Sequence, residues 1–542
     1  MTDIEIQNSC KKINIIDVAK KIGIDKNILL YGDDKAKIKF NEINGKENGK
    51  LILVTSINPT PYGEGKTTVS IGLNDGLNKI GKRSIAVLRE PSLGPVFGVK
   101  GGATGGGYSQ VMPISDINLH FTGDMHAITS ANDLISAAID NHIYYGNSLD
   151  IDVNNICFRR CLDVNDRALR SVNLSDRVEH FNITAASEVM SVLCLSNDLM
   201  DLKKRLSNIL IAYNSKGNPI YVSDLKLEGA LTVLLKDAIM PNLVQSLENN
   251  PVIIHGGPFA NIAHGCNSVI ATKLGLSISD YVVTEAGFGS DLGASKFFDI
   301  KCRSAKLKPN CVVIVATTKA LKYNAGVLKD DILKPNVKAI EKGISNLDAH
   351  IDNMLNYTKN IVVTLNKYDT DTDEEINYIK DYVINRGIDF SINDSYLLGG
   401  EGSVDLASKV VDICNKDIDF KLLYDEKLCI KDKIDIICKK VFHAGCINYS
   451  EEANKKIRMI ENINKDKLPI CVAKTQYSIS DDPKKLGYPK DYEIMVKDVN
   501  VYTGAGFIVV YLGDIMTMPG LSRNSNYLNI DIDSNYNIKG IF

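Results

Sequence analysis

Residues Thr60–Thr68 have the types and spacing of a loop that binds phosphate groups. The segment Thr-Pro-Tyr-Gly-Glu-Gly-Lys-Thr-Thr closely follows a short apolar stretch, Leu51–Ile57. Backbone N–H groups in such a turn, with the free amides at the start of the next helix, present positive partial charge to an anion. A lysine in this place reaches the terminal phosphates of a nucleotide, and the hydroxyl of the next threonine can hold Mg²⁺. The residues of the predicted nucleoside triphosphate site are Thr60, Pro61, Tyr62, Gly63, Glu64, Gly65, Lys66 and Thr67, with Thr67 as the magnesium ligand.

One position departs from the strict pattern of such loops, which has glycine where this chain has Thr60. The order of elements that the motif requires is present, because the β-rich stretch Leu51–Ile57 comes before the loop and a helical pattern, Lys66–Ile80, comes after it. The alternative interpretation is a glycine-rich turn that precedes Lys-Thr by chance. The order of elements favours the phosphate loop.

A second basic residue stands where a strand is expected to end. Arg89 follows Ser84–Leu88, the second strand of a predicted βαβ unit, and Pro91 keeps the segment after it from becoming helical. Ligands of open α/β sheets lie beyond the carboxyl ends of the strands, so we expect Arg89 and Lys66 to converge on one phosphate. A guanidinium there stabilises the charge on a transferring phosphoryl group. The alternative is a surface ion pair of Arg89 with Glu90 or another neighbour.

The elements that must position these residues alternate between apolar, β-rich stretches and helical patterns. Further strands are expected at Val252–Ile254, Tyr281–Thr284, Val312–Ala316, Ile361–Leu365 and Ile508–Leu512, and helices at Gly229–Ala238 and Asn261–Leu274. Such alternation is typical of an α/β fold. We therefore predict a P-loop-type nucleotide-binding domain with a largely parallel sheet, plus additional smaller α/β domains.

Composition and charge exclude several classes of protein. Hydrophobic residues make up 44% and charged residues 24% of the 542 residues, as in ordinary folded proteins, which excludes intrinsic disorder. The net charge of -3 leaves no basic excess for nucleic acid. No run of about 18 apolar residues can span a membrane, and the first residues lack the pattern of an export signal. We expect a cytoplasmic protein whose twelve cysteines are reduced thiols.

Other motifs carry weaker signals. Cys157, Cys161, His443 and Cys446 have no second matching pair to complete a zinc site. The glycines of Gly287–Gly293 lack the dinucleotide spacing, so NAD is not expected.

The longer motifs, taken together and in order, resemble those of one known family. They are Arg89–Ala103, Asn118–His126, Leu162–Arg170, Ile183–Met190, Pro241–Gln245, His255–Gly265, Thr284–Ala294, Ala473–Tyr477, Gly504–Phe507 and Met518–Leu521. With the phosphate loop, these segments are similar to formate–tetrahydrofolate ligase and cover nearly the whole chain.

The resemblance implies an ATP-dependent ligation of formate to tetrahydrofolate, which gives 10-formyltetrahydrofolate, ADP and phosphate through formyl phosphate. It implies Lys66 and Arg89 as catalytic residues, because the first step is a phosphoryl transfer that depends on positioning and charge. It also implies Mg²⁺ on Thr67, a monovalent cation (K⁺ or NH₄⁺) associated with Glu90, and assembly as a homotetramer. No nucleic acid and no membrane is expected as a partner.

The resemblance assigns the folate to three aromatic residues, because a flat pterin gains stacking and apolar burial together. The candidates are Phe288, Tyr368 and Tyr396. Two of them depart from the family pattern, which has Phe-Pro where this chain has Tyr368-Asp369 and Trp where it has Tyr396. Lys319 and Asn324 likewise replace an expected arginine and histidine, and no function is assigned to them.

The expected domains are 1–340, which binds the nucleotide, 341–430, an α/β domain that contributes folate-stacking residues, and 431–542, a C-terminal α/β domain. Two alternative functions stay open on the sequence alone. One is an ATP-dependent carboxylate ligase for another acid or amine, which the departures at the folate positions keep open. The other is a non-catalytic P-loop nucleotide switch.

Overall fold

A computed structural model describes residues 1–60, 63–98 and 104–541. The fold is mixed α/β, with one large, largely parallel sheet and several small sheets. The predicted α/β class with a largely parallel sheet is therefore confirmed. The helices of the described residues include none that is both long and apolar enough to cross a membrane.

The βαβ unit around the predicted phosphate loop has nearly the expected bounds. Strand β3 is Lys50–Ser56, helix α3 is Lys66–Lys79 and strand β4 is Ser84–Leu88. Because β3 and β4 are buried almost throughout, their sequences are continuous apolar runs. A Cβ at Gly72, on α3, would lie 2.3 Å from the Cβ of Ser395. This glycine lets the segment that carries Tyr396 pack directly on α3.

The order of strands in the large sheet is β1-β2-β14-β15-β4-β16-β3-β17-β18-β19. All pairs from β15 to β19 are parallel, whereas β1, β2, β14 and β15 pair antiparallel. The bounds not yet given are β1 Ile28–Leu30, β2 Ala36–Ile38, β14 Asn242–Ser246, β15 Pro251–Ile254, β16 Tyr281–Glu285, β17 Cys311–Ala316, β18 Ile361–Asn366 and β19 Asp389–Asn393. Strand β16 lies between β4 and β3, so β3 and β4 are not paired although only one helix separates them in the sequence.

The other expected strands are confirmed within one residue at each end, including the last of them, β24 (Phe507–Tyr511). The predicted bounds of the two expected helices are less accurate. Helix α9 is Glu228–Leu234, four residues shorter at its end than predicted. Residues 261–268 are not helical, so the prediction of a helix from Asn261 was wrong; α10 begins at Val269, where the Ser268 side chain caps the Ala271 N–H.

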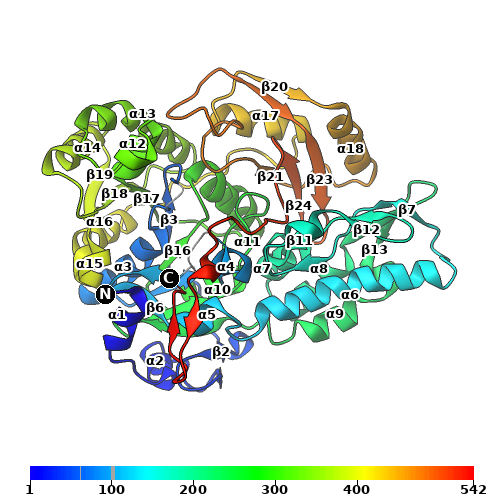
Figure 1. The fold of residues 1–542 in the computed structure, drawn as a ribbon, viewed down its shortest axis with the longest axis horizontal. Helices are drawn as coiled ribbons and strands as arrows, with labels where there is room; N and C mark the ends of the chain where they lie inside the picture. The colour runs from blue at the N-terminus through cyan, green and yellow to red at the C-terminus, as the bar shows by residue number, and fades with distance from the viewer. Residues whose placement is uncertain (61–62, 99–103, 542) are drawn as a thin grey trace.

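Two further groups of elements lie beside the large sheet (Figure 1). One contains the long helix α6 (Asp124–Tyr144) and the sheet β13-β12-β7; the other contains the sheet β21-β24-β23 and the pair β20-β22. The strand bounds are β7 Ile151–Ile156, β12 Leu210–Asn214, β13 Pro219–Tyr221, β20 Cys446–Tyr449, β21 Ile470–Ala473, β22 Glu493–Val496 and β23 Asp498–Tyr502. The expected domain borders stay a prediction; β18 and β19, from the predicted middle domain, continue the large sheet.

Candidate active site

The candidate site lies where three adjacent parallel strands end. Strand β3 leads into the loop before α3, β16 ends at Glu285, and β4 is followed by Arg89. Because the carboxyl ends of parallel strands meet at one edge of the sheet, residues far apart in sequence come together there. The order of strands therefore positions the site.

The loop before α3 is anchored by the side chain of Glu64, which is buried. The Thr60 N–H donates to Oε1 of Glu64 over 2.7 Å, and the Thr317 hydroxyl donates to Oε2. Gly63 and Gly65 have φ of 83° and 69°, a conformation that glycine adopts without strain. Burial raises the pKa of Glu64, while the hydrogen bond from Thr317 opposes the rise. The predicted site residues Pro61 and Tyr62 lie outside the described residues.

Lys66 is the first residue of α3, and its ammonium donates to Oγ of Ser56, at the end of β3, over 3.2 Å. Burial lowers the pKa of Lys66, and the carboxylates of Glu285 and Glu64 oppose this effect. The field of Arg89 also lowers this pKa, so the two cations lie near each other. A polyphosphate would supply the negative charge that stabilises both.

Glu285 connects the predicted magnesium ligand to the predicted catalytic arginine. The Thr67 hydroxyl donates to Oε2 of Glu285 over 2.9 Å, and Oε1 lies 3.5 Å from a terminal guanidinium nitrogen of Arg89. The Glu285 side chain is only 1% exposed. The sequence analysis assigned no role to Glu285. Its place at the end of a predicted strand was the available signal, but the strand order that makes it a neighbour of Thr67 was not predicted.

Arg89 keeps part of its hydrogen-bonding capacity free. Its side chain is 22% exposed, and the buried Nε donates no hydrogen bond to any atom of the described residues. A Cβ at Gly287 would lie 2.8 Å from the guanidinium, so this glycine makes room for it. Of the alternative ion pair with Glu90 or another neighbour, the structure shows a pair with a neighbour in space, the buried Glu285.

Glu90 lies in a separate, buried and acidic environment. Burial and then the carboxylate of Asp124 raise the pKa of Glu90 well above its ordinary value, and Lys37 opposes them. The Lys37 ammonium is held by Asp124 at 2.5 Å and by the Met240 carbonyl at 3.0 Å. The buried Oε2 of Glu90 accepts no hydrogen bond within the described part of the chain.

The donor groups present fit the two predicted cations. Mg²⁺ prefers oxygen ligands, and Thr67 and Glu285 offer a hydroxyl and a carboxylate at the start of α3. A monovalent cation would balance the negative charge around Glu90 and would be coordinated by its unpartnered Oε2. Residues 1–60, 63–98 and 104–541 contain no cluster of three or more His, Cys, Asp or Glu side chains that could hold a metal ion by itself. Any such cation therefore needs further ligands, such as carbonyl groups, water or substrate phosphate.

Of the three predicted folate residues, Phe288 contacts the end of β3, Tyr368 lies near Glu64, and Tyr396 lies near Tyr368. The Phe288 carbonyl accepts a hydrogen bond of 3.2 Å from Ser56, at the end of β3. Burial raises the pKa of Tyr368, and the charges of Glu64, Asp371 and Tyr396 act in the same direction, so Tyr368 lies near Glu64 of the loop and near Tyr396. The Lys319 ammonium lies 3.3 Å from the centre of the Tyr368 ring and covers one of its faces. The Tyr396 side chain packs against Gly106 and Gly107 and is 47% exposed, so part of its ring can contact a ligand.

The fold and the site together define a class: an α/β protein that gathers a lysine, an arginine and a buried carboxylate at the carboxyl ends of parallel strands, an arrangement suited to a phosphorylated ligand. A comparison with protein families gives the particular family. The model described as formate–tetrahydrofolate ligase matches residues 1–542, the whole chain. The chain belongs to this family of ATP-dependent ligases, whose substrates are formate, ATP and tetrahydrofolate.

Proposed function

We propose that residues 60–67 bind the triphosphate of ATP and that the ligation proceeds through formyl phosphate to 10-formyltetrahydrofolate, ADP and phosphate. The observation that carries this proposal is the convergence of Lys66, Thr67 and Arg89 around Glu285, at the ends of three neighbouring strands. The family match supports it independently.

In the first step, a carboxylate oxygen of formate attacks the terminal phosphorus of ATP. The bond from that phosphorus to its bridging oxygen breaks, and ADP leaves. Catalysis of such a transfer is almost entirely positioning and charge stabilisation. Lys66 and Arg89 supply two positive charges, and the free Nε–H of Arg89 can donate to a phosphoryl or formyl oxygen. Bound Mg²⁺, held by Thr67 and Glu285, would neutralise charge on the phosphate oxygens.

In the second step, the N10 amine of tetrahydrofolate attacks the formyl carbon. The bond from this carbon to the phosphate oxygen breaks, inorganic phosphate leaves, and the amine gives up its proton. The chain must therefore hold the folate next to the loop. Tyr368 lies near Glu64 of the loop and near Tyr396, and both rings offer aromatic surface for the pterin, while Phe288 comes shortly after the end of β16.

Glu90 is proposed as a ligand of the activating monovalent cation. Its carboxyl group adjoins Arg89 in sequence and carries the buried, unpartnered Oε2 noted above. A cation at this place would hold the Arg89–Glu90 segment in position and would touch neither reacting bond.

One experiment tests the order of bonds directly. The enzyme is incubated with ATP, Mg²⁺, tetrahydrofolate and formate labelled with ¹⁸O at both oxygens, and the phosphate released is analysed by mass spectrometry. A formyl phosphate intermediate transfers one ¹⁸O into each phosphate. Unlabelled phosphate would contradict the intermediate. ADP release in the absence of formate and tetrahydrofolate would indicate a nucleotide switch instead of a ligase.

A further inference from the structure

Asn58 connects the end of β3 to the phosphate loop and is completely buried. Its backbone N–H donates to Nε2 of His350 over 2.9 Å, and its side-chain oxygen accepts a hydrogen bond of 2.9 Å from Asn346. Both partners lie on α13 (Val337–Leu355). The chain is therefore fixed to this helix just before it enters the loop at Thr60.

The side-chain amide of Asn58 also joins two other parts of the chain. Its Nδ2 lies 3.3 Å from the carbonyl oxygen of Gln476 and 3.4 Å from Oδ1 of Asp291. Gln476 belongs to the segment Thr475–Ser478, which follows β21, and Asp291 belongs to a π-helical turn, Ser290–Ala294, which follows β16. Such turns are frequent at functional sites. A single amide thus links the base of the loop to the segment after β16 and to the C-terminal part of the chain.

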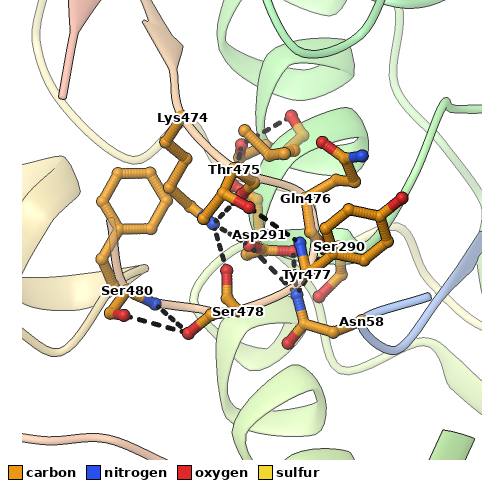
Figure 2. Close-up of polar contacts among 12 residues, drawn as sticks. Asn58, Ser290, Asp291, Lys474, Thr475, Gln476, Tyr477, Ser478 and Ser480 are labelled. Carbon is orange, nitrogen blue, oxygen red and sulfur yellow. Dashed lines mark hydrogen bonds and ion pairs between the residues drawn. The ribbon is translucent and has the colours of Figure 1, made fainter. Parts of the chain in front are cut away.

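Lys474 determines how the segment Thr475–Ser478 meets Asn58 (Figure 2). Its ammonium lies 2.6 Å from Oδ2 of Asp291 and donates to the carbonyl oxygens of Thr475, over 3.0 Å, and Ser478, over 2.5 Å. All three ammonium protons therefore have acceptors. Because Lys474 binds the carbonyl groups on both sides of Gln476, it fixes the direction of the Gln476 carbonyl toward Asn58.

The Lys474–Asp291 pair is fully buried, with both side chains 0% exposed. Burying two charges costs more free energy than burying an apolar pair of the same size, so such a pair is weak evidence for a role in stability alone. An apolar pair would hold the two segments together equally well. It would not orient the Gln476 carbonyl or present a carboxylate to the Asn58 amide.

We propose that the buried Lys474–Asp291 pair is a positioning element of the nucleotide site: through Gln476 and Asn58 it sets the position of the phosphate loop. The C-terminal segment 474–478 is then part of the machinery for phosphoryl transfer, although Lys474 and Asp291 touch no substrate. This inference rests on the proposed role of residues 60–67 in binding ATP.

The test compares two buried ion pairs, each formed by a lysine and a carboxylate. The first variant is Lys474→Met with Asp291→Asn, which leaves no unpaired charge in the interior. The matched control is Lys322→Met with Glu375→Gln, because Lys322 and Glu375 are 2.7 Å apart and 1% and 0% exposed, and this pair joins α12 (Thr318–Asn324) to α14 (Asp373–Asn385). For both, the thermal midpoint, the kinetic constants for ATP and the direct binding of tetrahydrofolate are measured.

We expect kcat/KM for ATP to fall between about tenfold and a hundredfold in the Lys474→Met/Asp291→Asn variant, because small misplacements of reacting groups cost that much. Tetrahydrofolate binding, measured by equilibrium dialysis, should change less than about twofold. The control pair should lose thermal stability to a similar degree and keep its kcat/KM for ATP within about twofold. Equal kinetic effects in both variants would overturn the proposal.

Asn58→Ala provides a second measurement that keeps the ion pair and its folding contribution. It should reduce kcat/KM for ATP to a similar extent, and adding it to the Lys474→Met/Asp291→Asn variant should cause little further loss, since residues that act through one another are not additive. If the losses in kcat/KM from the Asn58→Ala change and from the Lys474→Met/Asp291→Asn changes multiply in the combined variant, Asn58 and the ion pair act separately, which contradicts the proposal. If the double variant does not fold, an Asn58→Ala enzyme with unchanged ATP kinetics overturns it alone. Lys66→Ala distinguishes a failure of the positioning role from a failure of the ATP-binding role of residues 60–67. If that change leaves ATP turnover intact, the proposed function of the loop fails as well.

Discussion

The hydroxyl of Thr67 donates a 2.9 Å hydrogen bond to the carboxylate of Glu285, a residue 218 positions further along the chain. The same carboxylate faces Arg89 at 3.5 Å through its other oxygen. Glu285 therefore occupies the centre of the proposed site, between the start of α3 and the end of β4. Several expected results follow from this arrangement and from the residues around it.

Lys66→Ala should reduce kcat at least about a hundredfold, the usual cost of removing a group that stabilises charge in the transition state. The Lys66 ammonium lies among Glu285, Glu64 and Arg89, where the terminal phosphates are expected. Steady-state assays of ADP formation measure the effect. Lys79→Ala, at the opposite end of the same helix, is the control and should retain near-normal turnover. Turnover that survives the loss of Lys66 would show that the phosphates bind elsewhere.

Glu285→Gln should raise the Mg²⁺ concentration for half-maximal activity about tenfold or more, since residues that orient metal ligands have effects of that size. The amide oxygen can still accept from Thr67, but the negative charge that faces both Arg89 and the metal is lost. Titration of activity with Mg²⁺ at fixed ATP measures the shift. An unchanged Mg²⁺ requirement would remove Glu285 from the metal site.

Tyr396→Ala should raise KM for tetrahydrofolate about three- to tenfold with little effect on kcat, because aromatic stacking contributes about 0.5–1.5 kcal/mol beyond burial. The change spares the backbone contact in which Tyr108 N–H donates to the Tyr396 carbonyl, so the local fold persists. Tyr396→Phe keeps the ring and should behave like the native enzyme. An identical folate response in the alanine variant excludes stacking on this residue.

Glu90→Gln should abolish activation by K⁺ while preserving the fold. Burial raises the pKa of the Glu90 carboxyl and so favours its neutral form, which glutamine resembles in shape. Activity is measured against KCl, with choline chloride to hold ionic strength constant, and thermal unfolding checks the fold. If K⁺ stimulates the variant as strongly as the native enzyme, the cation binds at another place.

Glu188→Gln should change how stability depends on pH. The Glu188 side chain is buried and accepts hydrogen bonds from the N–H groups of Gly504 and Ala505. Burial raises the pKa of Glu188 from 4.5 to about 8. The folded state therefore binds more protons than the unfolded state between these values, and the contribution of Glu188 to stability is lost as pH rises through about 8.

The native protein should lose about 1 kcal/mol per pH unit relative to the Glu188→Gln variant between pH 5.5 and 7.5, since a group that titrates only in one state contributes at most about 1.4 kcal/mol per unit. Thermal unfolding of both proteins at several pH values measures the difference. Parallel curves would mean that Glu188 is ionised in the folded protein throughout this range.

The sequence predicted the local elements well and the tertiary neighbours poorly. The strands β3 and β4 and the helix α3 were located because each pattern has a clear end: Asn58 after β3, Gly81 after α3 and Arg89 after β4. The expected helix from Asn261 failed because only some of residues 261–268 are apolar, and Ser268 caps a helix that starts only at Val269.

The site was predicted in part for the same reason. Lys66 and Thr67 belong to a contiguous motif, so their types and spacing alone identify them. Glu285 can be identified as a site residue only when β16 is known to pair with β3. The contact of Asn58 with Gln476 likewise joins residues 418 positions apart. No local pattern encodes such a pairing; it arises from the order of strands and the packing of segments around them.

The position of β16 between β3 and β4 has a consequence for the newly made chain. A ribosome that has delivered only the first 280 residues has released the helix and both outer strands of the phosphate site but not the strand that joins them. The place between β3 and β4 is therefore filled by a strand that begins only at Tyr281, whereas β4 ends at Leu88. The loop before α3, Glu285 and Arg89 can come together at one edge of the sheet only after Tyr281–Glu285 has taken its place between β3 and β4.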